Sequence, residues 1–130
     1  MNGSGTAWAT LKCELAGEVV RTFGEARLRV LGTSMVPSIH PGDFISIQRA
    51  RLSDISLGEI ALYSRGGRLF AHRVVARAGS PELPLLVTRG DRLRNDDAPV
   101  SSLELLGTVH LIERGKRRLQ PATGDRKSVV

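Results

Sequence analysis

The stretch EIALYSRGGRLFAHRVVARA, residues 59–78, predicts a β-hairpin and with it the fold class. Its two halves, residues 59–64 and 68–78, are short alternating runs rich in apolar and β-branched residues, which is typical of strands. Between them, Gly66 and Gly67 mark the tip of a tight turn. Strands joined by so short a turn pair antiparallel, so this stretch indicates an antiparallel sheet.

Similar apolar runs recur on both sides of the hairpin. Turn-forming Gly, Pro, Ser and Asp residues separate them, as in a sheet of short strands. We therefore expect a mainly β protein, a coiled antiparallel β-sheet with one N-terminal helix. Aromatic residues make up only 4% of the chain, so the core must rest on Leu, Val and Ile. The further predicted strands are residues 27–31, 43–49, 84–89 and 105–112.

The N-terminal helix is predicted over residues 7–23 from an apolar stripe at helical spacing. Such a stripe can lie on a membrane surface, bind a partner protein or pack on the rest of the chain. Packing is favoured, because Glu14, Glu18 and only two basic residues make a poor face for anionic lipid. The stripe consists of Trp8, Leu11, Leu15, Val19 and Phe23.

The domain organisation follows from length and charge. A chain of 130 residues can bury a core without disulfides or metal, so we expect one main domain over residues 26–113, after a helical segment over 1–25. The remaining residues, 114–130, carry much of the formal charge of +6. No aromatics are interleaved there, which favours a disordered, solvated tail over a specific nucleic-acid partner.

Several classes of protein are excluded by composition. The single cysteine, Cys13, cannot form an internal disulfide, and the three histidines show no metal-ligand spacing, so no metal or cofactor is expected. No run approaches the ~20 apolar residues of a spanning helix, and the N-terminus does not have the pattern of a signal peptide. We expect a cytoplasmic protein, with peripheral membrane association left open.

A candidate nucleophile lies in residues 32–43, GTSMVPSIHPGD. Ser34 sits between Gly32 and Pro37, directly after an apolar run, so a constrained turn presents its hydroxyl. A hydroxyl needs a base to take its proton, and a neutral imidazole with a pKa of ~6.5 suits that work near pH 7. The strand over residues 68–78 could project His72 from one face as that base; a partly buried histidine bonded to backbone is the alternative.

A candidate orienting carboxylate lies in residues 88–97, TRGDRLRNDD. A Ser-His pair needs a group that fixes the imidazole tautomer and stabilises the imidazolium. The stretch offers Asp91, Asp96 and Asp97 for this role. The same residues also suit a simple Asp/Asn-rich turn, and the residues alone leave the choice open.

Together, the three stretches resemble the type I signal peptidase and LexA-like serine peptidase superfamily. The similarity runs from about Arg27 to Glu113, and His-Arg-Val-Val, thirty-eight residues after Ser34, is closest to the endoplasmic-reticulum and archaeal type, in which a histidine replaces the lysine base. The resemblance implies a Ser34 nucleophile, a His72 base and an orienting Asp97, six residues after a supporting Asp91. Further implied site residues are the substrate-binding Met35 and Pro37 and the supporting Asp96, Gly32 and Thr33.

Two departures from this family matter. Gly32 stands where several relatives have a serine whose hydroxyl helps to bind the oxyanion, which leaves the backbone N–H of Ser34 as the donor, with Thr33 as a second candidate. Loss of one such donor can cost ~10²–10³ in rate. The family's membrane anchor is also missing.

The resemblance implies a soluble serine endopeptidase that cleaves extended peptides after small residues, for example in the maturation of a leader peptide. Its partners would be peptide or protein substrates. Two alternatives stay open. One is a non-catalytic module that binds peptides or recruits partners on the same fold. The other is a LexA-like protein that cuts itself at Ala16-Gly17, although that bond falls inside the predicted helix.

Overall fold

A computed structural model describes residues 14–121 of the chain. Within that range, one helix over residues 14–23 precedes seven strands, and a 3₁₀ turn, η1 (Leu52–Asp54), follows the second strand. The mainly β fold class with one N-terminal helix is thereby confirmed. The strands are β1 (Glu25–Arg29), β2 (Phe44–Gln48), β3 (Ile60–Arg65), β4 (Arg68–Gly79), β5 (Pro84–Arg89), β6 (Leu105–Arg114) and β7 (Arg117–Leu119).

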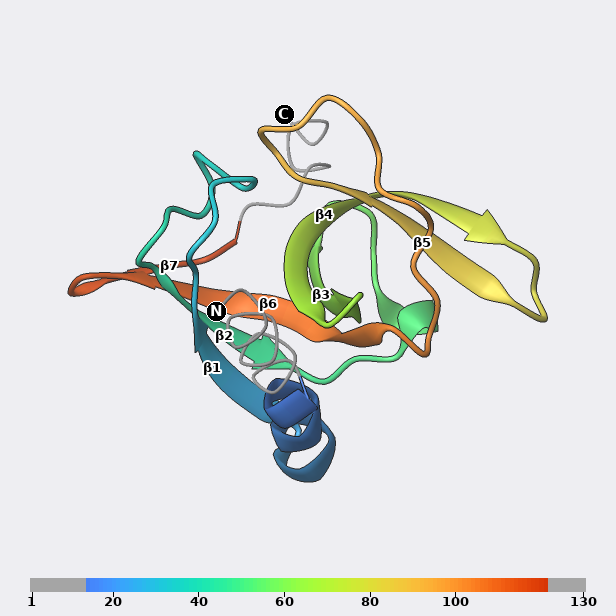
Figure 1. The fold of residues 1–130 in the computed structure, drawn as a ribbon, viewed down its shortest axis with the longest axis horizontal. Coiled ribbons are helices and arrows are strands. Elements are labelled where there is room, and N and C mark those ends of the chain that lie inside the picture. The colour runs from blue at the N-terminus through green and yellow to red at the C-terminus, as the bar shows by residue number, and fades with distance from the viewer. Residues whose placement is uncertain (1–13, 122–130) are drawn as a thin grey trace, which may run out of the picture.

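All paired strands are antiparallel and follow the order β1-β2-β6-β3-β4-β5 (Figure 1). The long strand β6 is central, because it pairs with β2 along one edge and with β3 along the other. Further along β6, on the edge that pairs with β3, residues 112–114 pair with β7. Strands distant in sequence are thus neighbours, so loops from different parts of the chain meet.

The predicted hairpin is confirmed as the pair β3–β4, in register from Ile60 opposite Arg73 to Arg65 opposite Arg68. Its turn uses Gly66 and Gly67, with φ of 60° and 74°, a conformation that favours glycine over residues with a Cβ. This register sets His72 opposite Ala61, in the middle of the sheet.

The core is almost wholly aliphatic, as the composition predicts. One cluster packs around Ile47, and a second gathers around Leu86 and the buried aromatic residue Tyr63. Met35 and Ile39 enter the first cluster from the loop between β1 and β2 and are 4% and 1% exposed. That loop is therefore anchored in the core, which restricts the movement of the residues beside it.

The helix packs through a face different from the one that the apolar stripe predicts. Ala16 and Val20 are 6% and 1% exposed, and Val20 belongs to the core, whereas Leu15, Val19 and Phe23 are 56%, 38% and 74% exposed. The expectation that the stripe packs on the chain is therefore wrong for these three residues, because the smaller side chains on the adjacent face make the contact. Trp8 and Leu11 lie outside the described residues.

The predicted tail also needs correction. The sheet does not end at residue 113, because β6 runs to Arg114 and turns through Gly115 into β7. Pairing with β6 makes residues 117–119 a strand despite their basic composition. Residues 122–130 of the predicted tail lie outside the described residues.

Candidate active site

Three side chains predicted from separate stretches come together in one hydrogen-bonded chain. Oγ of Ser34 lies 2.9 Å from Nε2 of His72, and Nδ1 of His72 lies 2.6 Å from Oδ2 of Asp97. Ser34 comes from the loop after β1, His72 from β4 and Asp97 from the loop after β5. The two loops rise on the same side of the sheet in Figure 1, where β4 runs beneath them.

Burial, ring contacts and hydrogen bonds fix the orientation of the His72 imidazole. It is 4% exposed, and the rings of Tyr63 and Phe70 meet its ring edge-on at centroid distances of 6.3 and 5.7 Å. The carboxylate of Asp97 can only accept from Nδ1, so in the neutral imidazole Nδ1 carries the proton. The lone pair of Nε2 then faces the hydroxyl of Ser34, as a general base requires.

Asp97 receives two further hydrogen bonds that the sequence did not reveal. Thr88 Oγ1 donates to Oδ2 over 2.7 Å, and the Tyr63 hydroxyl donates to the same oxygen over 3.0 Å. Desolvation raises the pKa of Asp97, but the hydrogen bonds from His72, Thr88 and Tyr63 outweigh it and leave the pKa below the usual value. Asp97 therefore remains an anion that can stabilise an imidazolium.

Tyr63 and Thr88 are themselves buried, at 1% and 0% exposure. Burial is the main cause that raises the pKa of Tyr63 to about 12, so its phenol stays neutral and keeps its proton as a donor. Thr88 Oγ1 also lies 3.4 Å from the Tyr63 hydroxyl oxygen, so the two donors to Asp97 are in contact with each other. The carboxylate is thus oriented by a closed polar network inside the second core cluster.

Asp91 occupies the supporting position expected from the sequence, with an arginine partner. Arg73 Nε and Nη2 donate to its two oxygens over 2.8 and 2.9 Å, and Ser38 Oγ donates over 2.6 Å. Desolvation raises the pKa of Asp91, but the hydrogen bonds from Arg73 and Ser38 lower it by more. Arg73 also donates to the carbonyl of Gly58 over 2.7 Å, so this network joins four segments of the chain.

Asp96 lies away from the imidazole. Its carboxylate is 3.4 Å from Arg89, and both side chains are about half exposed, at 50% and 43%. Of the three aspartates that the sequence offered, Asp97 alone contacts His72 in the described part of the chain.

Two residues assigned to substrate binding differ in their placement. The Met35 side chain is buried, and its sulfur accepts the Asp91 N–H over 3.3 Å. We therefore correct the assignment of Met35: its side chain belongs to the core and not to a surface open to substrate. Pro37, two residues further along the loop, is exposed.

The surroundings of the hydroxyl are open on one side. Gly32 and Thr33 are exposed, and a Cβ on Gly32 would meet no atom within 4 Å. Within residues 14–121, the backbone N–H of Ser34 donates to no acceptor, which leaves it available for an oxyanion. Gly32 itself offers no side-chain donor, as the sequence indicated.

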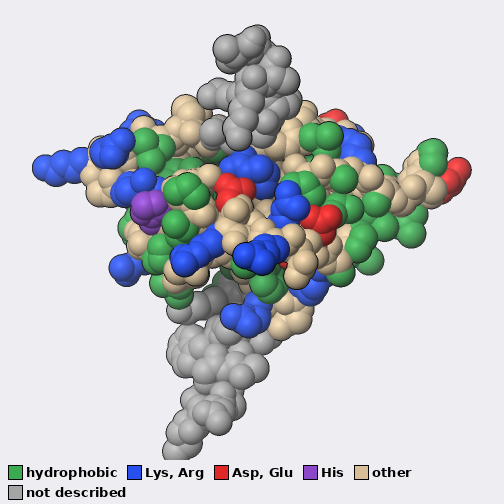
Figure 2. All heavy atoms as spheres, turned by 90° about the horizontal axis from the view of Figure 1, so that it is seen from above, with side chains coloured by type: hydrophobic (Ala, Val, Ile, Leu, Met, Phe, Trp, Pro, Cys, Tyr) green, Lys and Arg blue, Asp and Glu red, His purple; other side chains and the backbone are tan. Residues whose placement is uncertain are grey.

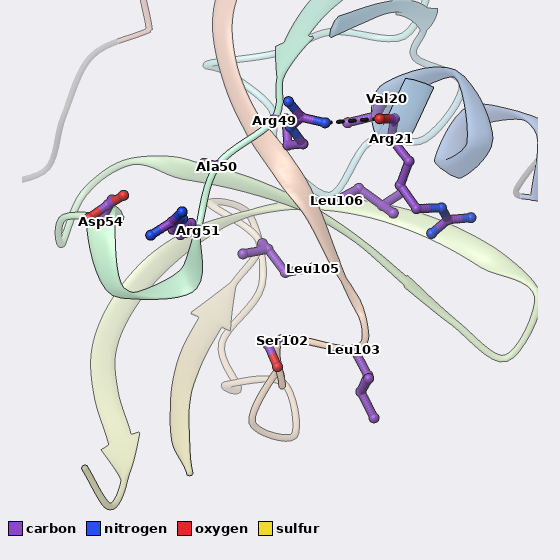
Figure 3. Close-up of a pocket in the computed structure, with 10 residues that line it drawn as sticks. All are labelled: Val20, Arg21, Arg49, Ala50, Arg51, Asp54, Ser102, Leu103, Leu105 and Leu106. Atoms are coloured by element: carbon purple, nitrogen blue, oxygen red, sulfur yellow. Dashed lines mark hydrogen bonds between the residues drawn. The ribbon is translucent and has the colours of Figure 1, made fainter. Parts of the chain in front are cut away.

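A hollow in the described part of the structure lies away from the three candidate active-site residues. It has a volume of about 690 Å³ and lies between the helix, the segment after β2 and the start of β6 (Figure 3). None of Ser34, His72 and Asp97 lines it. This hollow is therefore separate from the candidate active site. The lining residues are Val20, Arg21, Arg49, Ala50, Arg51, Asp54, Ser102, Leu103, Leu105 and Leu106.

Other features of the chain give no second candidate site. Among residues 14–121 no group of His, Cys, Asp and Glu side chains could hold a metal ion. None of the helical segments in that range is long and apolar enough to cross a membrane. The Ala16-Gly17 bond lies inside the helix, with both residues buried. Comparison of the sequence with protein-family models gives no match, and comparison with curated proteins gives none.

Proposed function

We propose that this chain is a serine endopeptidase that cleaves extended peptides after small residues, as in leader-peptide maturation in the cytoplasm. The observation that carries the proposal is the continuous hydrogen-bonded chain from the Ser34 hydroxyl through both nitrogens of His72 to Asp97. Nucleophile, base and orienting carboxylate are the three roles that serine-dependent acyl transfer requires. The burial of His72 and the lowered pKa of Asp97 support the same assignment.

The chemistry would proceed in two acyl transfers. Ser34 Oγ attacks the carbonyl carbon of the scissile bond while its proton moves to Nε2 of His72, and the Ser34 N–H binds the oxyanion. When the C–N bond breaks, the imidazolium gives that proton to the leaving amine. Water, deprotonated by His72, then releases the acyl group and regenerates the Ser34 hydroxyl.

The edge strand β1 offers a place for an extended substrate. The carbonyl of Gly24 accepts from the Arg49 N–H, and the N–H of Val30 donates to the Asp43 carbonyl, each over 2.8 Å. The N–H and C=O groups of the even-numbered residues of β1 therefore point toward β2. The odd-numbered residues of β1 then direct theirs to the other edge, where no strand pairs among the described residues. A peptide added there would run toward Ser34.

Peptide cleavage tests the proposal directly. Wild-type and Ser34→Ala proteins are incubated at pH 7.5 with a pool of peptides that carry Ala-x-Ala and related sites, and new termini are identified by mass spectrometry. Ser102→Ala, which changes an exposed serine remote from the three residues, serves as the matched control. We expect cleavage after small residues by the wild type and control only, with kcat reduced ~10⁴–10⁶-fold in Ser34→Ala. Equal cleavage by Ser34→Ala would contradict the proposal.

A second candidate is a peptide-binding module without turnover, which the bare Gly32 beside the nucleophile favours. In that case peptides bind equally well to wild type and Ser34→Ala, and neither produces new termini. Self-cleavage would instead give a fragment that begins at Gly17, which requires the helix to unfold locally.

A further inference from the structure

The turn that follows β5 is built directly against the nucleophile. The N–H of Arg92 donates to the carbonyl of Ser34 over 2.9 Å, and a Cβ on Gly90 would lie 2.7 Å from the same oxygen. Leu93 N–H closes the turn on the Gly90 carbonyl over 2.8 Å. Because the backbone of Arg92 contacts the backbone of Ser34, this turn lies directly beside the loop that carries the nucleophile.

Two of the three carboxylates of this segment are paired with arginines. Asp91 binds Arg73, and Asp96 pairs with Arg89. Their negative charges are therefore balanced locally, whereas Asp97 accepts a hydrogen bond from the imidazole of His72.

The arginines of the same segment carry an excess of positive charge. Arg92 and Arg94 are exposed, and neither forms an ion pair within the described residues. Arg29 lies on the edge strand β1, five residues before Ser34. It is also exposed and forms no ion pair within the described residues. Figure 2 looks onto the side of the molecule from which the two loops rise and shows Lys and Arg side chains over its middle, with fewer acidic ones.

We propose that Arg92 and Arg94 form a subsite that selects peptides with acidic side chains close to the scissile bond. This inference rests on the proposed peptidase function and adds the charge of its substrate. Unpaired guanidinium groups beside a peptide-binding site attract carboxylates and repel ammonium groups, and they raise the rate of encounter with acidic peptides. The preference should weaken as salt screens the charges.

Three peptides with one Ala-x-Ala core test the subsite. The core is flanked on each side by two aspartates, two asparagines or two lysines, and kcat/KM is measured at 50 mM and 500 mM NaCl. At low salt we expect the aspartate peptide to exceed the lysine peptide about tenfold, the scale of one or two exposed ion pairs. The double variant Arg92→Glu/Arg94→Glu should reverse this order.

The control makes the same change of charge elsewhere. Lys116→Glu/Arg117→Glu alters the exposed turn between β6 and β7, which lies outside the turn that contacts Ser34, and should keep the wild-type order. Arg94→Glu alone replaces the double variant if that protein does not fold, and it should reduce the preference several-fold.

The outcomes separate the subsite from the peptidase function. Ser34-dependent cleavage of all three peptides at equal kcat/KM, or a preference unchanged in the Arg92/Arg94 variant, overturns the subsite and leaves the peptidase function standing. If no peptide is cleaved, fluorescence anisotropy with labelled peptides and Ser34→Ala protein decides. Tighter binding of the aspartate peptide that is lost on charge reversal supports the subsite, whereas equal or absent binding overturns it.

Discussion

Arg73 binds both carboxylate oxygens of Asp91, with Nε 2.8 Å from Oδ1 and Nη2 2.9 Å from Oδ2. Two parallel charge-assisted bonds fix distance and orientation together, which a single ion pair does not. Arg73 follows His72 on β4, and Asp91 belongs to the turn that contacts Ser34. The pair therefore ties the strand of the base to the loop of the nucleophile.

Arg73→Gln should loosen this connection. The side chains of Arg73 and Asp91 are only 13% and 18% exposed, so the substitution leaves a mostly buried carboxylate without its cation. We expect a loss of about 2–3 kcal/mol in the free energy of unfolding, measured by urea denaturation, and at least a tenfold lower kcat. Arg27→Gln is the control, because its pair with Glu113 is 54% exposed on the arginine side and should contribute under ~1 kcal/mol. Equal losses in both variants would contradict the special role of Arg73.

The sequence predicted the strands well wherever a turn residue with a special conformation bounds them. Gly66 and Gly67 adopt positive φ, as does Gly79 at the end of β4, and the hairpin strands begin and end within about one residue of the prediction. β7 was missed, because its three residues are Arg, Arg and Leu and acquire strand structure from pairing with β6. The buried face of the helix was also mispredicted, since helical spacing identifies a stripe but not the surface that covers it.

For the candidate site, local sequence indicated which side chains to compare but not all of their contacts. Ser34, His72 and Asp97 lie in three distinct stretches, and only the sheet topology brings them within hydrogen-bond distance. Tyr63 looks like an ordinary strand residue, 34 positions from Asp97, and has no sequence signal of its role. Thr88 lies in the stretch of residues 88–97 that contains the candidate carboxylates. A threonine in a strand is usually explained by the strand preference of its β-branched side chain, so its hydrogen bond to Asp97 was not predicted.

Thr88→Val tests whether the network around Asp97 supports the base. Valine keeps the shape of the buried side chain but removes the 2.7 Å hydrogen bond to Oδ2, so the pKa of Asp97 should rise toward its usual value. A hydrogen bond to a charged group contributes about 1.5–3 kcal/mol, and we expect kcat to fall at least tenfold in peptide cleavage assays. Thr108→Val on β6 is the matched control, because Thr108 has no side-chain hydrogen bond in the described part of the chain, and its kcat should stay within about twofold. An unchanged kcat in Thr88→Val would show that His72 and Tyr63 suffice to hold the carboxylate.

Acid should destabilise the fold through its paired carboxylates. Desolvation raises the pKa of Asp43, Asp91 and Asp97, but their hydrogen bonds outweigh it, and the pKa of each lies below the ordinary value for an aspartate. The unfolded chain therefore takes up protons at a pH where the folded protein does not, so stability is complete above about pH 5 and is lost as the pH falls through the folded pKa values. Urea midpoints measured between pH 6 and pH 3 should decrease steadily.

Asp43→Asn separates one contribution from the rest. Arg114 binds both oxygens of this 2% exposed carboxylate, at 3.0 and 2.9 Å, so the variant should be less stable at pH 6. Its stability should also fall less steeply with acid, because one group with a lowered pKa is gone. A wild-type midpoint that is constant or rises from pH 5 to pH 3 would contradict the assigned directions of these pKa shifts.

Gly32→Ser should increase turnover if the oxyanion site has one donor too few. A Cβ at position 32 meets no atom within 4 Å, so the side chain has room and the free energy of unfolding should change by less than ~0.5 kcal/mol. One additional donor to an oxyanion is worth up to ~10²–10³ in rate, and we expect kcat to rise at least tenfold with little change in KM. Gly32→Ala is the matched control, because it adds the Cβ without a donor and should leave kcat near that of the wild type. A similar rise in both variants would assign the effect to a stiffer loop, and no rise in either would mean that the backbone N–H of Ser34 already satisfies the oxyanion.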